Sequence, residues 1–188
     1  KGRPRIAEGN VVKRTWFNRY KNLPRNFKDE NGRFVRNIKK VVVSVDTANK
    51  TTRRSNHSVA TVWIEDTANR HYLAEVVRKK VEINELIPMV EDLAAKWSAN
   101  EILVEDKGNG TTYIQLRRGR APAPIIAIQP EDDGSKEFRF DATIPMWEGG
   151  EVLLPEEASW LGDYEEEILS FPSEQNDQID STSQYLNR

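Results

Sequence analysis

A run rich in β-branched valine at positions 41–45 is the feature that most constrains the fold of this chain. It reads Val-Val-Val-Ser-Val and is followed directly by Asp46. Branched side chains pack well on the pleated surface of a sheet, so such a run favours a buried strand. The sequence therefore predicts a strand over residues 40–46 that presents an acid at its carboxyl end.

Two more apolar runs follow along the chain. Residues 59–64 and 72–77 have strand composition, whereas 47–57 is polar and 65–69 has the composition of a turn. Successive strands usually pair as neighbours, here through a long polar loop and then a turn. We expect a three-stranded antiparallel meander.

The next segment changes to helical spacing, with Asn84 as the expected cap. The apolar residues that recur at this spacing are Leu86, Ile87, Val90, Leu93, Ala94 and Trp97. Strand patterns return at residues 101–105 and 125–128, and a hairpin-like insertion is expected around residues 134–154. The order predicts an α/β fold, in which a mixed central sheet gains parallel strands through crossover helices.

Length and composition limit the possible chemistry. The chain has 188 residues, 37% of them hydrophobic, which is enough for one α/β domain. It contains no cysteine, which excludes disulfides, thiolate ligands and cysteine nucleophiles, so any metal must bind oxygen or histidine. No apolar run is long enough to span a bilayer, and we expect a soluble intracellular protein without a membrane partner.

Charge is distributed unevenly along the chain. Residues 1–40 hold thirteen Lys and Arg against three Asp and Glu, and the remainder holds fifteen against twenty-seven. We expect residues 1–38 to form a basic linker and residues 39–188 to form the folded domain. Such a basic arm suits contact with a polyanion, although a solvated linker beside a solvated acidic surface explains the same distribution.

Acids follow two of the predicted strands directly. Asp46 and Glu105 both end apolar runs, and sites in α/β sheets form at the carboxyl ends of strands. Asp177 and Asp180 form an i, i+3 pair that a helix would place on one face. Three carboxylates from distant segments suit hard divalent cations. Spacing alone leaves simpler readings open, because strand ends and helix caps also favour Asp.

Several segments together resemble the nuclease domain of the large terminase subunit of tailed bacteriophages, over nearly the whole chain. They read Val-Ser-Val-Asp-Thr-Ala (43–48), Val-Glu-Asp-Lys-Gly-Asn-Gly (104–110), Gly-Ser-Lys-Glu-Phe-Arg (134–139), Trp-Glu-Gly-Gly-Glu-Val-Leu-Leu-Pro (147–155), Glu-Glu-Ile-Leu-Ser-Phe-Pro (166–172) and Asn-Asp-Gln-Ile-Asp (176–180).

The resemblance implies a ribonuclease-H-like, RuvC-like fold and an endonuclease that uses two Mg²⁺ or Mn²⁺ ions. Such an enzyme cuts concatemeric double-stranded viral DNA during genome packaging, in the cytoplasm of the infected bacterial host. The implied partners are DNA, the amino-terminal ATPase motor, the small terminase subunit and the portal. The chain has no Gly-x-x-x-x-Gly-Lys-Ser/Thr phosphate loop, so we expect no ATPase activity from it.

The resemblance also assigns roles to individual acids. Asp46 is expected to bridge both ions, with Glu105 and Asp177 as the flanking ligands. Asp180 matches a second position of the last motif at which an acid is frequent. It is a further candidate metal ligand, or a side chain that holds such a ligand in place. Asp106 is the alternative to Glu105, but side chains alternate along a strand, so both are not expected to bind directly.

Basic residues in the same segments are candidates for contact with the DNA backbone. They are Lys107, Lys136, Arg139, Arg117 and Arg118. The chain departs from the family pattern at Asn176, where an acid is common, and at His57, near which many members carry an acid. His57 is therefore a candidate metal or phosphate contact, or else an exposed loop residue.

Two other functions fit the same residues. A RuvC-like resolvase or a transposase-type nuclease places similar acids on the same fold and would prefer branched DNA. The domain would otherwise be a DNA-gripping assembly module with little isolated nuclease activity. Metal-dependent cleavage separates an enzyme from a binding module.

Overall fold

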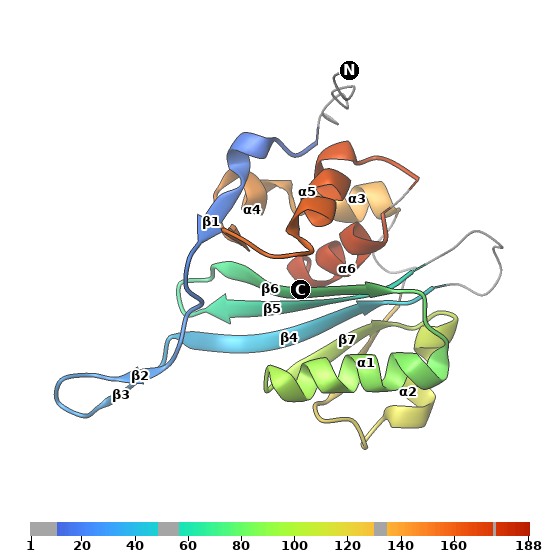
Figure 1. Ribbon diagram of the computed structural model, residues 1–188, viewed down its shortest axis with the longest axis horizontal. Coiled ribbons are helices and arrows are strands. Elements are labelled where there is room, and N and C mark those ends of the chain that lie inside the picture. The colour runs from blue at the N-terminus through green and yellow to red at the C-terminus, as the bar shows by residue number, and fades with distance from the viewer. Residues whose placement is uncertain (1–10, 49–56, 130–134, 175) are drawn as a thin grey trace.

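A seven-stranded mixed sheet with helices on both faces forms the body of the molecule (Figure 1). The computed structural model describes residues 11–48, 57–129, 135–174 and 176–188. The strand order is β1-β9-β6-β5-β4-β7-β8. None of the helices within these ranges is long and apolar enough to cross a bilayer.

The centre of the sheet is the predicted meander. β4 (Ile38–Asp46), β5 (Ser58–Asp66) and β6 (His71–Lys79) pair antiparallel in chain order. Residues 41–45 of β4 and all of β5 are buried. The first two apolar runs thus form strands that are covered on both faces, and the third joins them as the sequence predicted.

Parallel strands extend the sheet on the β4 side. β7 (Glu101–Glu105) pairs with β4, and β8 (Ile125–Ile128) pairs with β7. The crossovers run through α1 (Ile83–Lys96) and α2 (Asn109–Arg117). The expected helix and both expected strands are confirmed, and α2 is an addition that the sequence did not predict.

α1 begins earlier than its expected cap would place it. Glu82 is the N-cap, and it forms a reciprocal capping box with Glu85. This pair satisfies backbone N–H groups at the helix start, so Asn84 lies inside the first turn and does not cap it. Pro88 consequently falls in the second turn of α1.

The expectation of a hairpin-like insertion at residues 134–154 is wrong for the described part of that segment. Two short helices, α3 (Lys136–Asp141) and α4 (Ile144–Glu148), precede β9 (Val152–Pro155). Each helix sends one fully buried aromatic side chain into the same core, Phe140 from α3 and Trp147 from α4. Burial of these two large side chains stabilises helices that would be too short to form alone.

The amino-terminal segment contributes to the sheet. After the short helix η1 (Arg14–Trp16), β1 (Asn18–Tyr20) pairs parallel with β9 and forms the edge of the sheet. β2 (Phe27–Lys28) and β3 (Phe34–Val35) form a separate hairpin that projects from the body (Figure 1). The structure thus places part of the segment expected to be a linker within the sheet; residues 1–10 lie outside the described ranges.

The two faces of the sheet carry separate cores. α1 and α2 cover one face, while α5 (Leu161–Ser170) and α6 (Asp177–Leu186) cover the other, together with α3 and α4 (Figure 1). Alternation along β4 sends Val43 and Val45 to the α1 face and Val42 to the α6 face. The same alternation directs Asp46 toward α6.

Candidate functional site

Asp46 and Glu105 end neighbouring strands at the same edge of the sheet. β4 and β7 are parallel, and their last registered pair is Val45 with Val104. The next residue on each strand is the acid, so the two acids lie side by side. Leu103 packs in the core beneath α6, and alternation places Glu105 on that same face. The sequence left open whether these two strands are parallel neighbours, and the structure shows that they are.

Hydroxyl groups dock α6 closely onto the sheet. Ser44 Oγ donates to the carbonyl oxygen of Ser181 at 2.7 Å, and Ser181 Oγ donates to the carbonyl oxygen of Ser44 at 2.8 Å. Thr61 Oγ1 lies 2.7 Å from Ser181 Oγ. Small polar side chains allow the helix and strand to approach, and each of these buried hydroxyls finds a partner. This contact sets Asp180, the residue before Ser181, over the end of β4.

Three carboxyl groups therefore share one partly buried region. Burial raises the pKa of Asp46 well above its usual range, and the nearby charges of Asp180 and Glu105 raise it further. The pKa of Asp180 is also raised, first by burial. Carboxylates that repel one another in this way favour either a proton or a cation between them.

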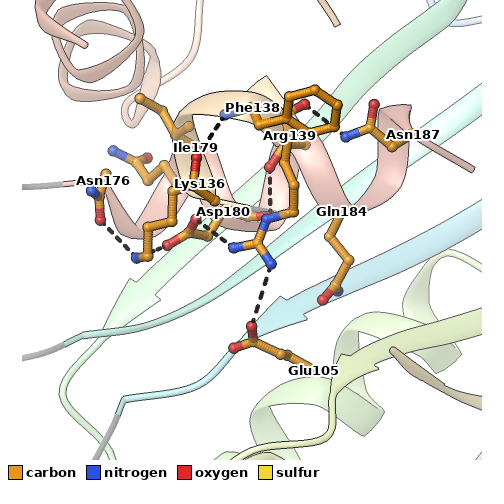
Figure 2. A network of polar contacts seen from close by, with 12 residues as sticks. Glu105, Lys136, Phe138, Arg139, Asn176, Ile179, Asp180, Gln184 and Asn187 are labelled. Atoms are coloured by element: carbon orange, nitrogen blue, oxygen red, sulfur yellow. Dashed lines mark hydrogen bonds and ion pairs between the residues drawn. The ribbon is translucent and has the colours of Figure 1, made fainter. Parts of the chain in front are cut away.

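Two cations from α3 lie against these acids (Figure 2). Lys136 Nζ forms a short ion pair with Asp180 and donates to Asn176 Oδ1 at 3.0 Å. Arg139 lies 3.5 Å from Asp180 and 3.8 Å from Glu105, so its guanidinium bridges the two carboxylates. Burial alone would lower the pKa of Lys136, but attraction to the acids outweighs it and the pKa is raised.

The donor set fits a hard divalent cation by its chemistry. Carboxylate oxygens are the ligands that Mg²⁺ and Mn²⁺ prefer, and Asp180 Oδ1 accepts no hydrogen bond from any described residue. Within the described part of the chain, however, no three acidic or histidine side chains stand close enough together to enclose an ion. Lys136 and Arg139 supply the local positive charge in this arrangement.

Asp177 lies farther from the centre of the site than Asp180. It is the first residue of α6 and pairs with Arg78 of β6 at 3.6 Å. Among the acids that raise the pKa of Asp46, Asp180 has the largest influence and Asp177 the smallest. Nearly one helical turn separates the two acids, which places Asp180 over β4 and Asp177 toward β6.

Asp106 lies apart from the three carboxylates. Gln129 Nε2 donates to its side chain at 3.1 Å, and hydrogen bonds from Thr111 and Gln129 lower its pKa. Adjacent side chains at a strand end point in opposite directions. The structure thus favours Glu105 over Asp106 as the strand-end ligand.

His57 precedes β5 and lies toward the end of β6. Its pKa is lowered, first by burial and then by the charges of Arg78 and Lys80, with Asp177 acting in the opposite sense. Its Nδ1 atom is buried without a hydrogen-bond partner among the described residues. His57 therefore belongs to the surroundings of Arg78 and not to the group of three carboxylates.

The other basic candidates are divided between the two faces. Lys107 is exposed, two residues beyond Glu105. Arg117 makes two hydrogen bonds with Glu91, at 2.6 and 2.8 Å, and these join α2 to α1 on the opposite face of the sheet. Arg118 is the next residue and ends the same helix. The structure does not bring Arg117 or Arg118 to the carboxylates.

Sequence analysis missed the connection that fixes the end of β7 to the end of β4. Thr47 Oγ1 accepts from the backbone N–H of Gly110 at 3.0 Å and donates to the carbonyl oxygen of Lys107 at 3.3 Å. A Cβ atom on Gly110 would lie 2.1 Å from the carbonyl oxygen of Glu105. Glycine is therefore required there, and the Gly-Asn-Gly sequence was the available signal.

Glu167 is a second residue that the sequence did not single out. It lies buried on α5, and its carboxylate accepts from Gln178 N at 2.7 Å, Gln178 Nε2 at 2.7 Å and Ile179 N at 3.2 Å. Burial raises its pKa, even though these hydrogen bonds act to lower it. The side chain satisfies the free N–H groups at the start of α6 and so positions the helix that carries Asp180.

Comparison with known sequences finds one matching family. The profile of the terminase RNaseH-like domain matches residues 43–188, which includes all three carboxylates. A search of curated proteins finds no match.

Comparison with solved structures finds the same fold in phage and yeast proteins. The large terminase nuclease of thermophilic phage G20c with bound zinc matches with a TM-score of 0.61 and 12% identity, over 92% of each chain. The nuclease domain of the P22 large terminase matches at 0.54 and 14%, over 79% of this chain and 81% of the other. The yeast mitochondrial Holliday junction resolvase Ydc2 matches at 0.51 and 12%, over 77% and 78%.

Proposed function

This chain belongs to the family of terminase ribonuclease-H-like domains, and from that premise we propose that it is a divalent-cation-dependent endonuclease that cuts double-stranded DNA. One observation carries the proposal. Asp46 and Glu105 end neighbouring parallel strands, and the docking of α6 through Ser181 sets Asp180 over the same edge of the sheet, so three acids from distant segments converge there.

Asp46, Glu105 and Asp180 would hold the cations, with Asp46 central and Asp177 completing the set. This order gives Asp180 a larger role than Asp177, because Ser181 docks next to Asp180 on β4, whereas Asp177 pairs with Arg78 of β6. We propose two Mg²⁺ or Mn²⁺ ions, which when bound would activate a water and stabilise charge on the leaving oxygen. Structures of the G20c nuclease with bound zinc, cobalt or magnesium support a divalent cation in this fold.

Lys136 and Arg139 would have two successive partners. In the structure they neutralise Asp180 and Glu105. Cations that bound these acids would take over that role and would free both side chains to contact the scissile phosphate. Lys107, exposed two residues beyond Glu105, is a further candidate for that contact. Hydrolysis adds water to the phosphorus and breaks its bond to the 3′ oxygen, and the basic side chains would hold the anionic phosphate during that step.

The biological reaction that we propose is the cutting of concatemeric viral DNA during genome packaging in the host cytoplasm. A large terminase from a thermophilic bacteriophage, solved in complex with ADP, matches with 14% identity and a TM-score of 0.55, and the match covers only 40% of that chain. By analogy, an ATPase motor would accompany this domain in the virus, and a small terminase subunit and a portal would be further partners.

The decisive experiment is plasmid cleavage with and without Mg²⁺ or Mn²⁺. Asp46→Asn keeps the size of the side chain but removes its charge, and we expect it to abolish nicking. Asp92→Asn, which changes an acid on α1, on the other face of the sheet, is the matched control and should retain activity. Cleavage by Asp46→Asn at the normal rate, or equal cleavage in EDTA, would overturn the proposal.

A second function, the resolution of branched DNA, is favoured by one observation. The fold is shared with the yeast mitochondrial Holliday junction resolvase, whose name records a branched substrate. Cleavage of a four-way junction at least tenfold faster than a linear duplex of equal length would support it. Tight DNA binding without cleavage under any metal would instead support a DNA-gripping module.

A further inference from the structure

A cavity of about 490 Å³ lies at the end of β6, where Arg78 pairs with Asp177, and has no role in the reaction proposed above. The ends of β5 and β6 form one wall, and α5 and α6 form the other. Its polar lining includes His57, Arg78, Lys79, Asp163 and Gln178. Arg78 and Lys79 are cationic and Asp163 is the one acid among the lining residues, although the chain as a whole is acidic.

Arg78 continues the row of residues that contains the acids. Across the sheet, Asp46 is registered with Val59, and Val59 is registered with Arg78. Two strand spacings therefore separate Asp46 from Arg78, roughly 10 Å. One strand of DNA rises about 3.4 Å per nucleotide, so Arg78 lies within about three nucleotides of a phosphate held at Asp46.

The Arg78 side chain is only partly satisfied. Its Nη2 atom lies 3.6 Å from Asp177, while its Nε atom has no hydrogen-bond partner among the described residues, and 25% of the side chain is exposed. His57 Nδ1 also lacks a partner there. Both residues line the cavity, and these two nitrogen atoms are themselves buried, so the exposed quarter of the Arg78 side chain is the part that a phosphate could reach.

Acidic side chains lie on the other side of Arg78. A neighbouring cavity of about 460 Å³ is lined by Arg78 together with Asp163, Glu166, Glu167 and Glu174. A polyanion would be repelled from that side. Asp163 lines both cavities, but the first also holds Lys79, whereas the second holds three further acids, so the first is the more favourable for an anion.

We propose that the cavity beside His57 and Arg78 is a subsite for a backbone phosphate of the DNA, a few nucleotides from the cleaved bond. Arg78 supplies the principal contact and His57 a secondary one. The contact is to phosphate and carries no base specificity. The inference rests on the proposed function, because it takes DNA as the ligand.

The test measures DNA binding in EDTA, so that it does not depend on metal or cleavage. Binding of a fluorescein-labelled duplex of about 20 base pairs is followed by anisotropy between about 50 and 200 mM NaCl. Arg78→Gln should weaken binding about fivefold and reduce the slope of log K against log salt by about 1, the value for one lost phosphate contact. Arg78→Lys keeps the charge and should retain the slope.

Lys96→Gln is the matched control, because it removes one positive charge on α1, across the sheet from the cavity. It should leave the salt slope unchanged. An unchanged slope for Arg78→Gln, or an equal loss for Lys96→Gln, would overturn the subsite. Thermal unfolding of each variant shows whether it folds. If Arg78→Gln does not fold, His57→Ala decides instead: weaker DNA binding by that variant supports the subsite, and unchanged binding overturns it.

The two proposals can fail separately. If the unchanged protein cleaves DNA and the Arg78→Gln slope does not move, only the subsite is wrong. If the unchanged protein never cleaves DNA but Arg78→Gln loses one phosphate contact, the subsite stands and the nuclease assignment falls.

Discussion

Removal of the Glu167 carboxylate should loosen α6 by an amount that the structure allows us to work out. In Glu167→Ala, the backbone N–H groups of Gln178 and Ile179 lose their acceptor, and both residues are buried. An unsatisfied buried donor costs about 1–3 kcal/mol, so the loss of folding free energy should be about 2–6 kcal/mol. Whole domains are stable by only about 5–15 kcal/mol, so the effect is large.

Glu167→Gln should behave differently. Its amide oxygen can still accept from the two backbone groups, and a rotated Gln178 amide can meet its NH₂ group. Burial raises the pKa of Glu167, which shows that its charge is penalised in the folded state, so loss of that charge costs little. We expect a change within about 1 kcal/mol of the parent protein.

Urea unfolding followed by tryptophan fluorescence measures both variants. Glu166→Ala is the matched control, because Glu166 is the exposed neighbour on the same helix and should change stability by less than about 0.5 kcal/mol. The reasoning would be refuted if Glu167→Ala lost under about 1 kcal/mol at an unchanged m-value, or if Glu166→Ala lost as much as Glu167→Ala.

Three further outcomes are expected. Hydrogen bonds from the backbone and from Arg70 overcome the effect of burial and lower the pKa of Asp66, so Asp66→Asn should cost about 1–3 kcal/mol of folding free energy near neutral pH. The difference between the parent protein and the variant should shrink as the pH falls below the usual carboxyl pKa and through the lowered one. Urea midpoints measured across this pH range would show it. Gly110→Ala should destabilise the fold by about 2–4 kcal/mol in thermal unfolding, whereas Gly162→Ala, with open space around it, should be neutral or slightly stabilising. Mg²⁺ at about ten times its Kd should stabilise the protein by about 1.4 kcal/mol and should leave Asp46→Asn unaffected, as melting curves with and without the ion would reveal.

Much of the central sheet could be predicted from the sequence because its strands are buried on both faces. Runs such as 41–45 then become almost continuously apolar and are easy to recognise. The positions of Asp46 and Glu105 follow from the same runs, since each acid marks the point where a buried strand ends. The parallel pairing of β4 with β7, which the sequence left open, brings the two acids side by side.

The parts that sequence analysis missed depend on contacts between distant segments. α3 and α4 span six and five residues, too short for a clear helical period, and their aromatic side chains meet a core built elsewhere. β1 has only three residues and forms because β9 offers a free edge. The choice between Asp177 and Asp180 depends on how α6 docks through Ser181, which no local pattern records.

Docking of α6 also determines when the site exists. Ser44 and Ser181 join the helix to the strand across 137 positions of the chain. Synthesis proceeds from the amino terminus, so β4 and β7 are complete while the segment that carries Asp180 has yet to be made. A nascent chain, or one cut before α6, would hold the sheet edge with Asp46 and Glu105 but lack the third carboxylate. The nuclease activity that we propose would therefore require the synthesis and docking of α6.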